Sequence, residues 1–247
     1  MLQKTNPKKS NIALSIDNLV VYAPEHTTFA NNDSFCKFAS IPANLKRRCS
    51  KASKIALEAA NRAKGQKEVQ HAVFCSQHGE LDCAVNLLQD IAHKQLLSPM
   101  EFSQSVHNTA AGLFSVMHNF NQDTVTIAAG ENTFLMGMLE AFTWLQLNPG
   151  KTLLLVIFNA YMPVEYQAFN DIVNDEYAVA FLLVDNVHQE NSVSFSIQAA
   201  ANERQNTNKK TPAALEFVEW FLHSATKELI QSATWQNFRW HRNDINS

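Results

Sequence analysis

One stretch in the second half of the chain constrains the fold more than any other feature. Residues 151–159 read KTLLLVIFN and are almost continuously apolar. Successive side chains of a strand point to opposite faces of a sheet, so an uninterrupted apolar strand buries both of its faces. The sequence therefore predicts a sheet that is covered on both sides.

The rest of the pattern supplies helices for these two faces. Apolar residues at helical spacing alternate along the chain with short β-branched runs, which is typical of an α/β fold. We expect one domain over residues 1–247, with a mostly parallel sheet, helices on both faces, and flexible segments at 1–11 and 202–210. Strands are predicted at 12–22, 69–76, 124–129, 151–159 and 177–185, and helices at 45–64, 80–95, 106–120 and 133–147.

Two further elements are predicted near the C-terminus. Residues 192–199 (SVSFSIQA) alternate in polarity and are expected to pair antiparallel with the strand at 177–185. Thr211 and Pro212 are expected to open a last helix that ends at about residue 230. The aromatic residues of the tail either dock on a partner or lock the C-terminus to the body. They are Trp235, Phe238 and Trp240.

Charge, cysteine spacing and hydropathy exclude several classes of function. The 247 residues carry a formal net charge of −3, whereas a chain that binds nucleic acid normally presents a basic face. The four cysteines form no C-x-x-C pair and the histidines fit no ligand spacing, so we expect no cofactor and no metal. The longest apolar run is too short to span a bilayer, and the start lacks a signal-peptide core. A cytoplasmic protein is expected.

Glycine is scarce, with six residues in the whole chain and none after Gly150. No G-x-G-x-x-G and no G-x-x-x-x-G-K-[ST] occurs, so the common phosphate-binding loops are excluded.

Residues 98–147 contain an ordered set of short motifs. Ser-Pro at 98–99 is followed by NTAAG at 108–112, which opens a predicted helix, and by the small-residue strand TVTIA at 124–128. This order resembles the N-terminal half of a β-ketoacyl synthase, a condensing enzyme with the thiolase fold. The resemblance implies a thiolase-like sheet. It marks Asn108, Gly112 and Gly130 as motif residues.

Three segments resemble a narrower group. FCSQHGELD (74–82), FSQSVHN (102–108) and AAGENTF (128–134) are similar to half-length ketosynthase-like proteins, the chain length factors associated with aryl polyene biosynthesis in bacteria. The similarity extends over residues 12–240 and is strongest between 71 and 147.

The residue on which condensation depends is missing. In active ketosynthases a cysteine at a helix N-terminus takes the acyl group from a carrier-protein thioester, and the helix dipole and backbone N–H groups support the anion. Counting without gaps from Asn108 to Ala141 places that position at Glu131, and a two-residue gap places it at Ala129. Neither side chain can hold an acyl thioester, and the glycine-rich contexts of the two assisting histidines do not occur. The resemblance therefore implies a non-catalytic homologue.

Such homologues act through a partner. In type II polyketide systems a subunit that has lost its cysteine, often to glutamine, completes the acyl tunnel of an active ketosynthase and sets the chain length. The resemblance implies pairing with a full-length ketosynthase through the strand before the nucleophile helix, and an acyl carrier protein is a further candidate partner. A buried Glu131 would be protonated or bound to backbone N–H groups, unless it faces solvent. Candidate partner or tunnel residues are Thr124, Thr126, Phe134, Met136 and Met138, with core packing as the alternative for the last three.

Two alternatives stay open. In the first, the chain is a small acyltransferase or thioesterase that uses Cys75 or Ser105. In the second, it is a homodimeric scaffold that recruits carrier protein. Ser105 lies near His107, but no G-x-S-x-G elbow is present, and capping of the helix near Asn108 is the simpler role. The basic run 46–48 (Lys-Arg-Arg) either meets an acidic partner or is a solvated helix start.

Overall fold

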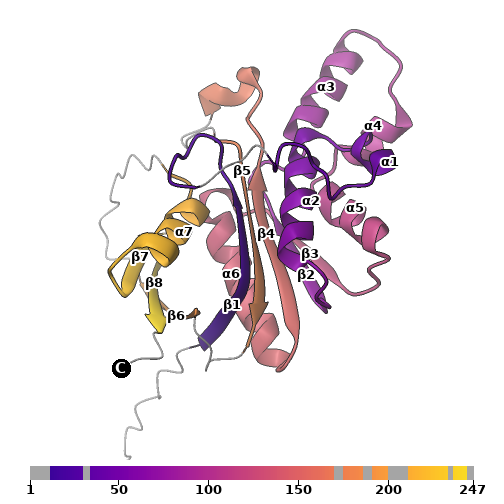
Figure 1. Ribbon diagram of the computed structural model, residues 1–247. Coiled ribbons are helices and arrows are strands. Elements are labelled where there is room, and N and C mark those ends of the chain that lie inside the picture. Colours follow the sequence, from indigo (N-terminus) through magenta and orange to yellow (C-terminus); the bar gives the residue numbers. More distant parts are fainter. Residues whose placement is uncertain are drawn as a thin grey trace, which may run out of the picture.

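The computed structural model describes residues 12–29, 34–169, 175–185, 191–199, 211–232 and 236–243. Its strands form one eight-stranded sheet in the order β3-β2-β4-β5-β1-β6-β8-β7 (Figure 1). The segments 1–11 and 202–210, which we expect to be flexible, lie outside the described residues. The strands are β1 (Ile12–Tyr22), β2 (His71–Cys75), β3 (Thr124–Ile127), β4 (Thr152–Asn159), β5 (Tyr177–Val184), β6 (Ser192–Ala199), β7 (Glu228–Ser232) and β8 (Gln236–Asn243).

The sheet is mixed, which corrects the expectation of a mostly parallel one. β2 pairs in parallel with β3 and with β4, and the other five pairings are antiparallel. Parallel neighbours need a long crossover, which the helices between β2, β3 and β4 provide. β4 and β5 are instead antiparallel neighbours, and the described part of the segment between them contains the 3-10 helix η2 (Val164–Phe169).

The predicted pairing of β6 with β5 is wrong. Both edges of β5 are occupied, by β4 and by β1, and β6 pairs with β1 and β8. β1 therefore lies inside the sheet although it comes first in the chain. Its last residue, Tyr22, donates a hydrogen bond of 2.5 Å to Oε1 of Glu176, 154 positions later.

Helices cover both faces of the sheet, as predicted. α2 (Lys51–Lys64) and α5 (Thr109–His118) lie on one face, and α6 (Thr133–Leu147) and α7 (Ala213–His223) on the other (Figure 1). β4 contributes to both cores, with Leu154 facing α2 and α5 and Leu155 facing α6 and α7. Both are fully buried, which accounts for the apolar run at 151–159. Within the described ranges, none of the helices combines the length and apolar character that a membrane span requires.

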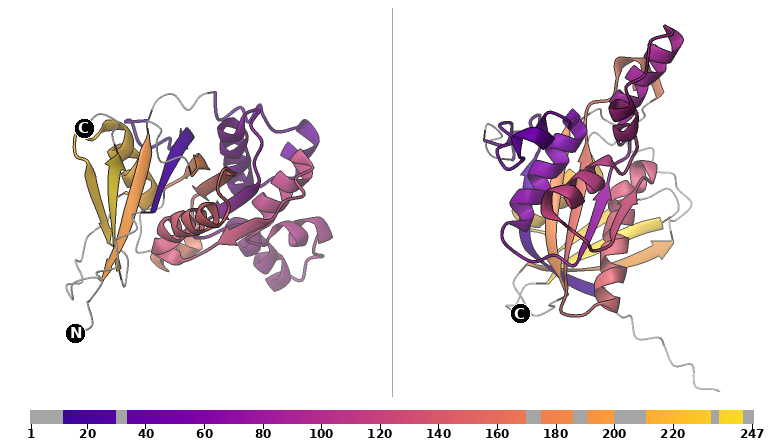
Figure 2. Two further views of the ribbon diagram at one scale, coloured as in Figure 1. Left: turned by 90° about the horizontal axis from the view of Figure 1, so that it is seen from below. Right: turned by 90° about the vertical axis from the view of Figure 1, so that its right-hand side faces the viewer.

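The helix predicted to reach about residue 230 ends at His223, and the β7–β8 hairpin follows. Phe217 of α7 packs on Phe181 of β5 and on Trp240 of β8, with ring centroids 5.9 and 5.0 Å apart, so the sheet curls around α7 (Figure 2). Phe238 and Trp240 are fully buried and lock the tail to the body. Trp235 lies outside the described residues.

Candidate functional site

Two of the three motif segments meet at one end of the sheet. β2, β3 and β4 are parallel, so their carboxyl ends lie together, where open α/β sheets usually place their sites. Ser76, directly after β2, donates its hydroxyl to Oδ1 of Asn159 at 2.9 Å and accepts the backbone N–H of Gly79 at 2.8 Å. Nε2 of His107 lies 2.8 Å from the Ser76 carbonyl oxygen. These bonds hold segment 102–108 against segment 74–82.

Gly79 allows this contact. Its φ is +56°, a left-handed conformation that side chains rarely adopt, and a Cβ there would lie 2.8 Å from Cδ2 of His107. The approach of the two segments therefore depends on glycine at this position.

Asn159 is the member of the network that the sequence does not single out. Its Oδ1 also accepts the backbone N–H of Gln77 at 3.0 Å, and its Nδ2 donates to the hydroxyl of Tyr177 at 3.3 Å. Burial raises the pKa of Tyr177, so its phenol stays neutral. The sequence does contain a signal for Asn159, because a polar side chain at the end of a buried apolar strand needs hydrogen-bond partners.

The turn between β3 and α6 carries both candidate positions of the lost nucleophile. Glu131 lies exposed in the 3-10 helix η1 (Gly130–Asn132), and Ala129 is half-buried just before it. The Thr133 hydroxyl accepts the Ala129 N–H at 3.0 Å and donates to the Gly130 carbonyl at 2.7 Å. Glu131 therefore faces solvent, which is one of the alternatives expected for it from the sequence.

Cys75 is fully buried at the end of β2. Its Sγ lies against α6 beside Gly137, so close that a Cβ on Gly137 would lie 2.5 Å from the sulfur. Burial raises the pKa of the Cys75 thiol far above its usual range, and the Glu140 carboxylate adds to the rise. Since the thiolate is the reactive form, this environment favours an inert packing residue.

We expect iodoacetamide to alkylate Cys36 in the folded protein and to leave Cys75 unmodified. Cys36 is exposed, whereas Cys75 becomes accessible only when the structure opens, so its reaction is expected to be about a thousandfold slower or more. Peptide mass spectrometry checks this, and labelling in denaturant, where both thiols should react at similar rates, is the control. An acyl adduct on Cys75 after incubation with an acyl-carrier thioester would contradict the prediction.

Ser105 and His107 do not form a catalytic pair. The Ser105 hydroxyl donates to the Phe102 carbonyl at 2.9 Å, whereas His107 bonds to segment 74–82. A nucleophile and its base have to lie within hydrogen-bond reach of each other. The expectation that Ser105 caps the next helix is also wrong, because Asn108 occupies the N-cap position of α5.

The remaining candidates are distributed between the core and the surface. Phe134 and Met138 of α6 are buried in the core, and Met136 is half-buried at its margin. Thr124 on β3 is exposed and Thr126 is half-buried. The motif residues Asn108, Gly112 and Gly130 are exposed.

β3 is an edge strand of the sheet. Among the described strands it pairs only with β2. The carbonyl oxygens of Asp123 and Ile127 accept hydrogen bonds from backbone N–H groups on that side. In a parallel ladder alternate residues bond to the same neighbour, so Thr124 and Thr126 direct their N–H and C=O groups outward. Such an edge is a template for a strand of another chain.

The segment at 81–104, here called the arm, stands out from the body of the protein (Figures 1 and 2). It consists of α3 (Leu81–Ala92), α4 (Pro99–Gln104) and their connection. Its apolar side chains are largely in solvent, with Leu96 99% and Phe102 64% exposed. Exposed apolar surface of this kind marks an interaction site. The exposed apolar residues are Leu88, Ile91, Leu96, Leu97, Met100 and Phe102.

Basic residues are concentrated on α1 (Ala43–Lys46), on α2 and in the adjoining loops, and this part of the chain, residues 34–67, is here called the basic segment. Residues 34–67 contain nine basic side chains and one acidic side chain, Glu58, which is buried and bound to Arg62 at 2.8 Å. Arg47 and Arg48 are exposed. The basic residues are Lys37, Lys46, Arg47, Arg48, Lys51, Lys54, Arg62, Lys64 and Lys67.

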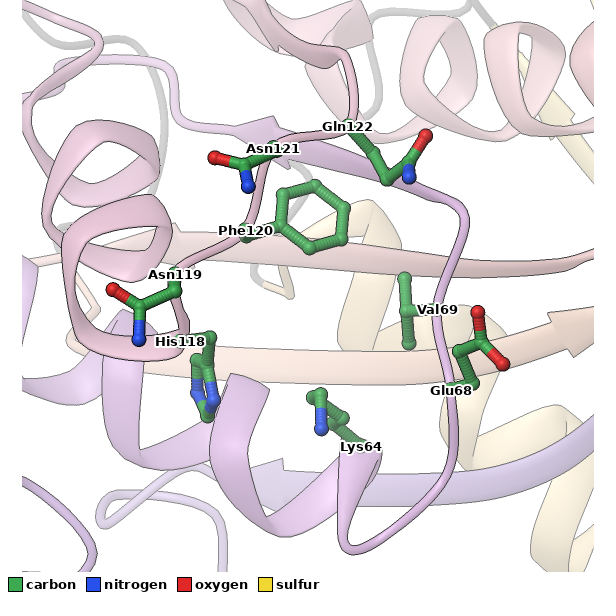
Figure 3. A pocket seen from close by; sticks show the side chains of 8 residues that line it. All are labelled: Lys64, Glu68, Val69, His118, Asn119, Phe120, Asn121 and Gln122. Atoms are coloured by element: carbon green, nitrogen blue, oxygen red, sulfur yellow. The ribbon is translucent and has the colours of Figure 1, made fainter.

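A polar pocket of about 270 Å³ lies at the opposite end of the sheet, before β2 and β3 (Figure 3). Lys64 and Glu68 line one wall, and residues 118–122 line the other. None of the candidate residues faces it. In the described part of the chain, no three His, Cys, Asp or Glu side chains are grouped so that they could hold a metal ion.

Comparison with known proteins identifies the fold. The family model of the β-ketoacyl synthase N-terminal domain matches residues 22–241. The structure is similar to a chain of the ketosynthase ApeO in complex with its chain length factor ApeC from Xenorhabdus doucetiae, with a TM-score of 0.76 and 23% identity over 93% of this chain and 99% of that one. No curated protein matches the chain by sequence.

Two further solved structures have the same fold. The ishigamide ketosynthase/chain length factor matches with a TM-score of 0.57 and 14% identity over 77% of this chain and 68% of that one. A β-ketoacyl synthase from Burkholderia phymatum STM815 matches with a TM-score of 0.53 and 11% identity over 68% of this chain and 52% of that one. The thiolase-like α/β class expected from the sequence is confirmed.

Proposed function

Because the chain belongs to the family of the β-ketoacyl synthase N-terminal domain, we propose that it is a non-catalytic chain length factor. It pairs with an active, full-length β-ketoacyl synthase and shapes the acyl tunnel of that enzyme. The observation that supports the proposal is the turn between β3 and α6, where the count from Asn108 would put Glu131, or Ala129, in place of the nucleophile. A carboxylate or a methyl group cannot carry an acyl thioester.

The free edge of β3 supports the pairing. Thr124 and Thr126 present their backbone groups to a second chain, and the strand runs directly into the turn with Glu131. A partner strand on this edge would continue the sheet and set the register between the two subunits.

The arm supports the role in chain length. Its exposed apolar side chains lie on a projecting segment, so they reach the partner rather than the core of this chain. Of the candidate tunnel residues on α6, Met136 is half-buried, while Phe134 and Met138 pack in the core. Apolar side chains at the end of an acyl tunnel limit the length of the bound chain by occupying its volume.

The basic segment at 34–67 extends the proposal to an acyl carrier protein. The exposed Arg47 and Arg48 suit an acidic protein surface, and opposite charges there would increase the association rate. The pathway we propose is aryl polyene biosynthesis, which is of the type II polyketide kind. We place the protein in the cytoplasm and propose that its chain forms a single domain.

No observation favours a stand-alone acyltransferase or thioesterase. Cys75 is buried with a raised pKa, and Ser105 lacks a base.

Co-expression with the full-length β-ketoacyl synthase encoded nearest to this gene tests the proposal. We expect the two chains to elute together in size-exclusion chromatography and the complex to make products of a different length from those of the synthase alone. Two separate peaks with unchanged synthase activity would overturn the proposal.

Leu96→Asp is expected to weaken this complex by about 10-fold or more. The side chain is 99% exposed, so the isolated chain should keep its stability to within about 0.5 kcal/mol, whereas a charge in an apolar interface opposes binding. The matched control is Ile230→Asp, which places the same charge on β7 at the other edge of the sheet. If titration calorimetry shows that the two variants bind the synthase with equal affinity, the arm is not part of the interface.

A further inference from the structure

The free edge of β3 is open in principle to a strand of any chain, including a second copy of this one. An identical copy pairs about a two-fold axis, which places the start of one β3 beside the end of the other. Which chain pairs with β3 therefore depends on the residues at the two ends of the strand.

Both ends of β3 carry an exposed carboxylate. Asp123 comes directly before the strand, and Glu131 lies in the turn that follows it. In a two-fold pair, Asp123 of each copy approaches the turn that bears Glu131 of the other, which creates two contacts between like charges. Like charges placed opposite each other in a sheet oppose pairing.

The composition of the neighbouring sequence is also acidic. Between positions 77 and 147 the chain has seven carboxylates, of which Glu80 is buried, and one lysine, Lys94. Asp82 and Glu101 are exposed on the arm itself. The basic residues are concentrated at 34–67, on α1, α2 and the adjoining loops, and of these Lys64 lines the pocket that residues 118–122 close on the other side.

We infer that the acidic ends of β3 select a partner with a basic surface at this edge and exclude a second copy of this chain. The inference rests on the proposed function for the identity of the partner, a β-ketoacyl synthase. The attraction comes from the strand edge and the apolar arm, and the carboxylates determine which chain is accepted.

The double substitution Asp123→Asn and Glu131→Gln tests this, because it keeps the side-chain shapes and removes both charges. The control is Glu219→Gln with Glu228→Gln, two exposed carboxylates on α7 and β7 at the far end of the sheet, the second of which also gives up its ion pair with Arg239. Circular dichroism melting curves establish that both double variants are folded.

Analytical ultracentrifugation of the isolated chain gives the first readout. In about 20 mM NaCl, where screening is weak, we expect the wild type and the control to stay monomeric. The neutralised variant is expected to self-associate roughly 5- to 30-fold more tightly, the effect of removing two like-charge contacts. In about 0.5 M NaCl this difference should disappear. A wild-type chain that dimerises at low salt as tightly as the neutralised variant overturns the inference.

Titration with the co-encoded synthase gives the second readout. The neutralised variant is expected to bind the synthase roughly 5- to 30-fold more weakly than wild type or control. Equal binding by wild type and neutralised variant overturns the inference and leaves the proposed function intact. If no form binds the synthase while neutralisation still promotes self-association, the proposed function fails and the exclusion of a second copy stands.

Discussion

Replacing Trp240 with alanine is expected to lower the free energy of unfolding by about 3–5 kcal/mol, the usual cost of removing a large buried aromatic ring. Trp240 is fully buried, and its indole N–H donates to Oε1 of the buried Gln231 at 3.0 Å. Five other rings surround it with centroids 5.0–6.5 Å away: Phe134, Phe142, Phe195, Phe217 and Phe238.

For a chain of this length the loss corresponds to a fall in melting temperature of roughly 6–20 °C, which differential scanning calorimetry measures. Trp240→Phe is the matched control, because it keeps a ring in the cluster and loses mainly the hydrogen bond, at about 1–2 kcal/mol. A Trp240→Ala protein that melts within about 2 °C of wild type would show that β8 does not hold the curled end of the sheet together.

Thr126→Pro is expected to weaken binding of the synthase partner roughly 30- to 150-fold. The N–H of Thr126 points away from β2, so proline should leave the pairing of β3 with β2 in place. It removes the donor that a partner strand would use, and a lost donor with its unpaired acceptor costs about 2–3 kcal/mol.

Thr126→Ala separates the side chain from the backbone in this experiment, because it keeps the N–H and should bind within a fewfold of wild type. The readouts are the dissociation constant from titration calorimetry and the melting temperature of the isolated chain. If the proline variant binds as tightly as the alanine variant while both are folded, β3 is not the strand that meets the partner.

Local patterns were sufficient for the elements that depend on local burial. Helix α6 has the predicted bounds, 133–147, and β4 and β5 were predicted to within one residue at each end, because their apolar runs reflect two covered faces. The β7–β8 hairpin was missed. β7 alternates between exposed and buried positions over only five residues, and that run was assigned to the preceding helix.

The order of the strands in the sheet could not be predicted from local patterns in the same way. Which strand lies beside β1 depends on residues more than 150 positions away, and the pattern of β6 suits any antiparallel neighbour. At the site, the segments 74–82 and 102–108 were found by resemblance, but Asn159 was not, because its role arises only when β4 ends beside β2. Likewise, the burial of Cys75 depends on Gly137 of a helix that crosses it.

The position of β1 has a consequence for how the protein is made. Tyr22 leaves the ribosome 154 residues before its hydrogen-bond partner Glu176, an interval of about 8–30 s at ordinary rates of synthesis. During that time β1 has neither of its neighbours, since β5 and β6 both come later in the chain. The middle of the sheet is thus completed late, and a nascent chain that stalls before residue 177 carries an unpaired hydrophobic strand that favours aggregation.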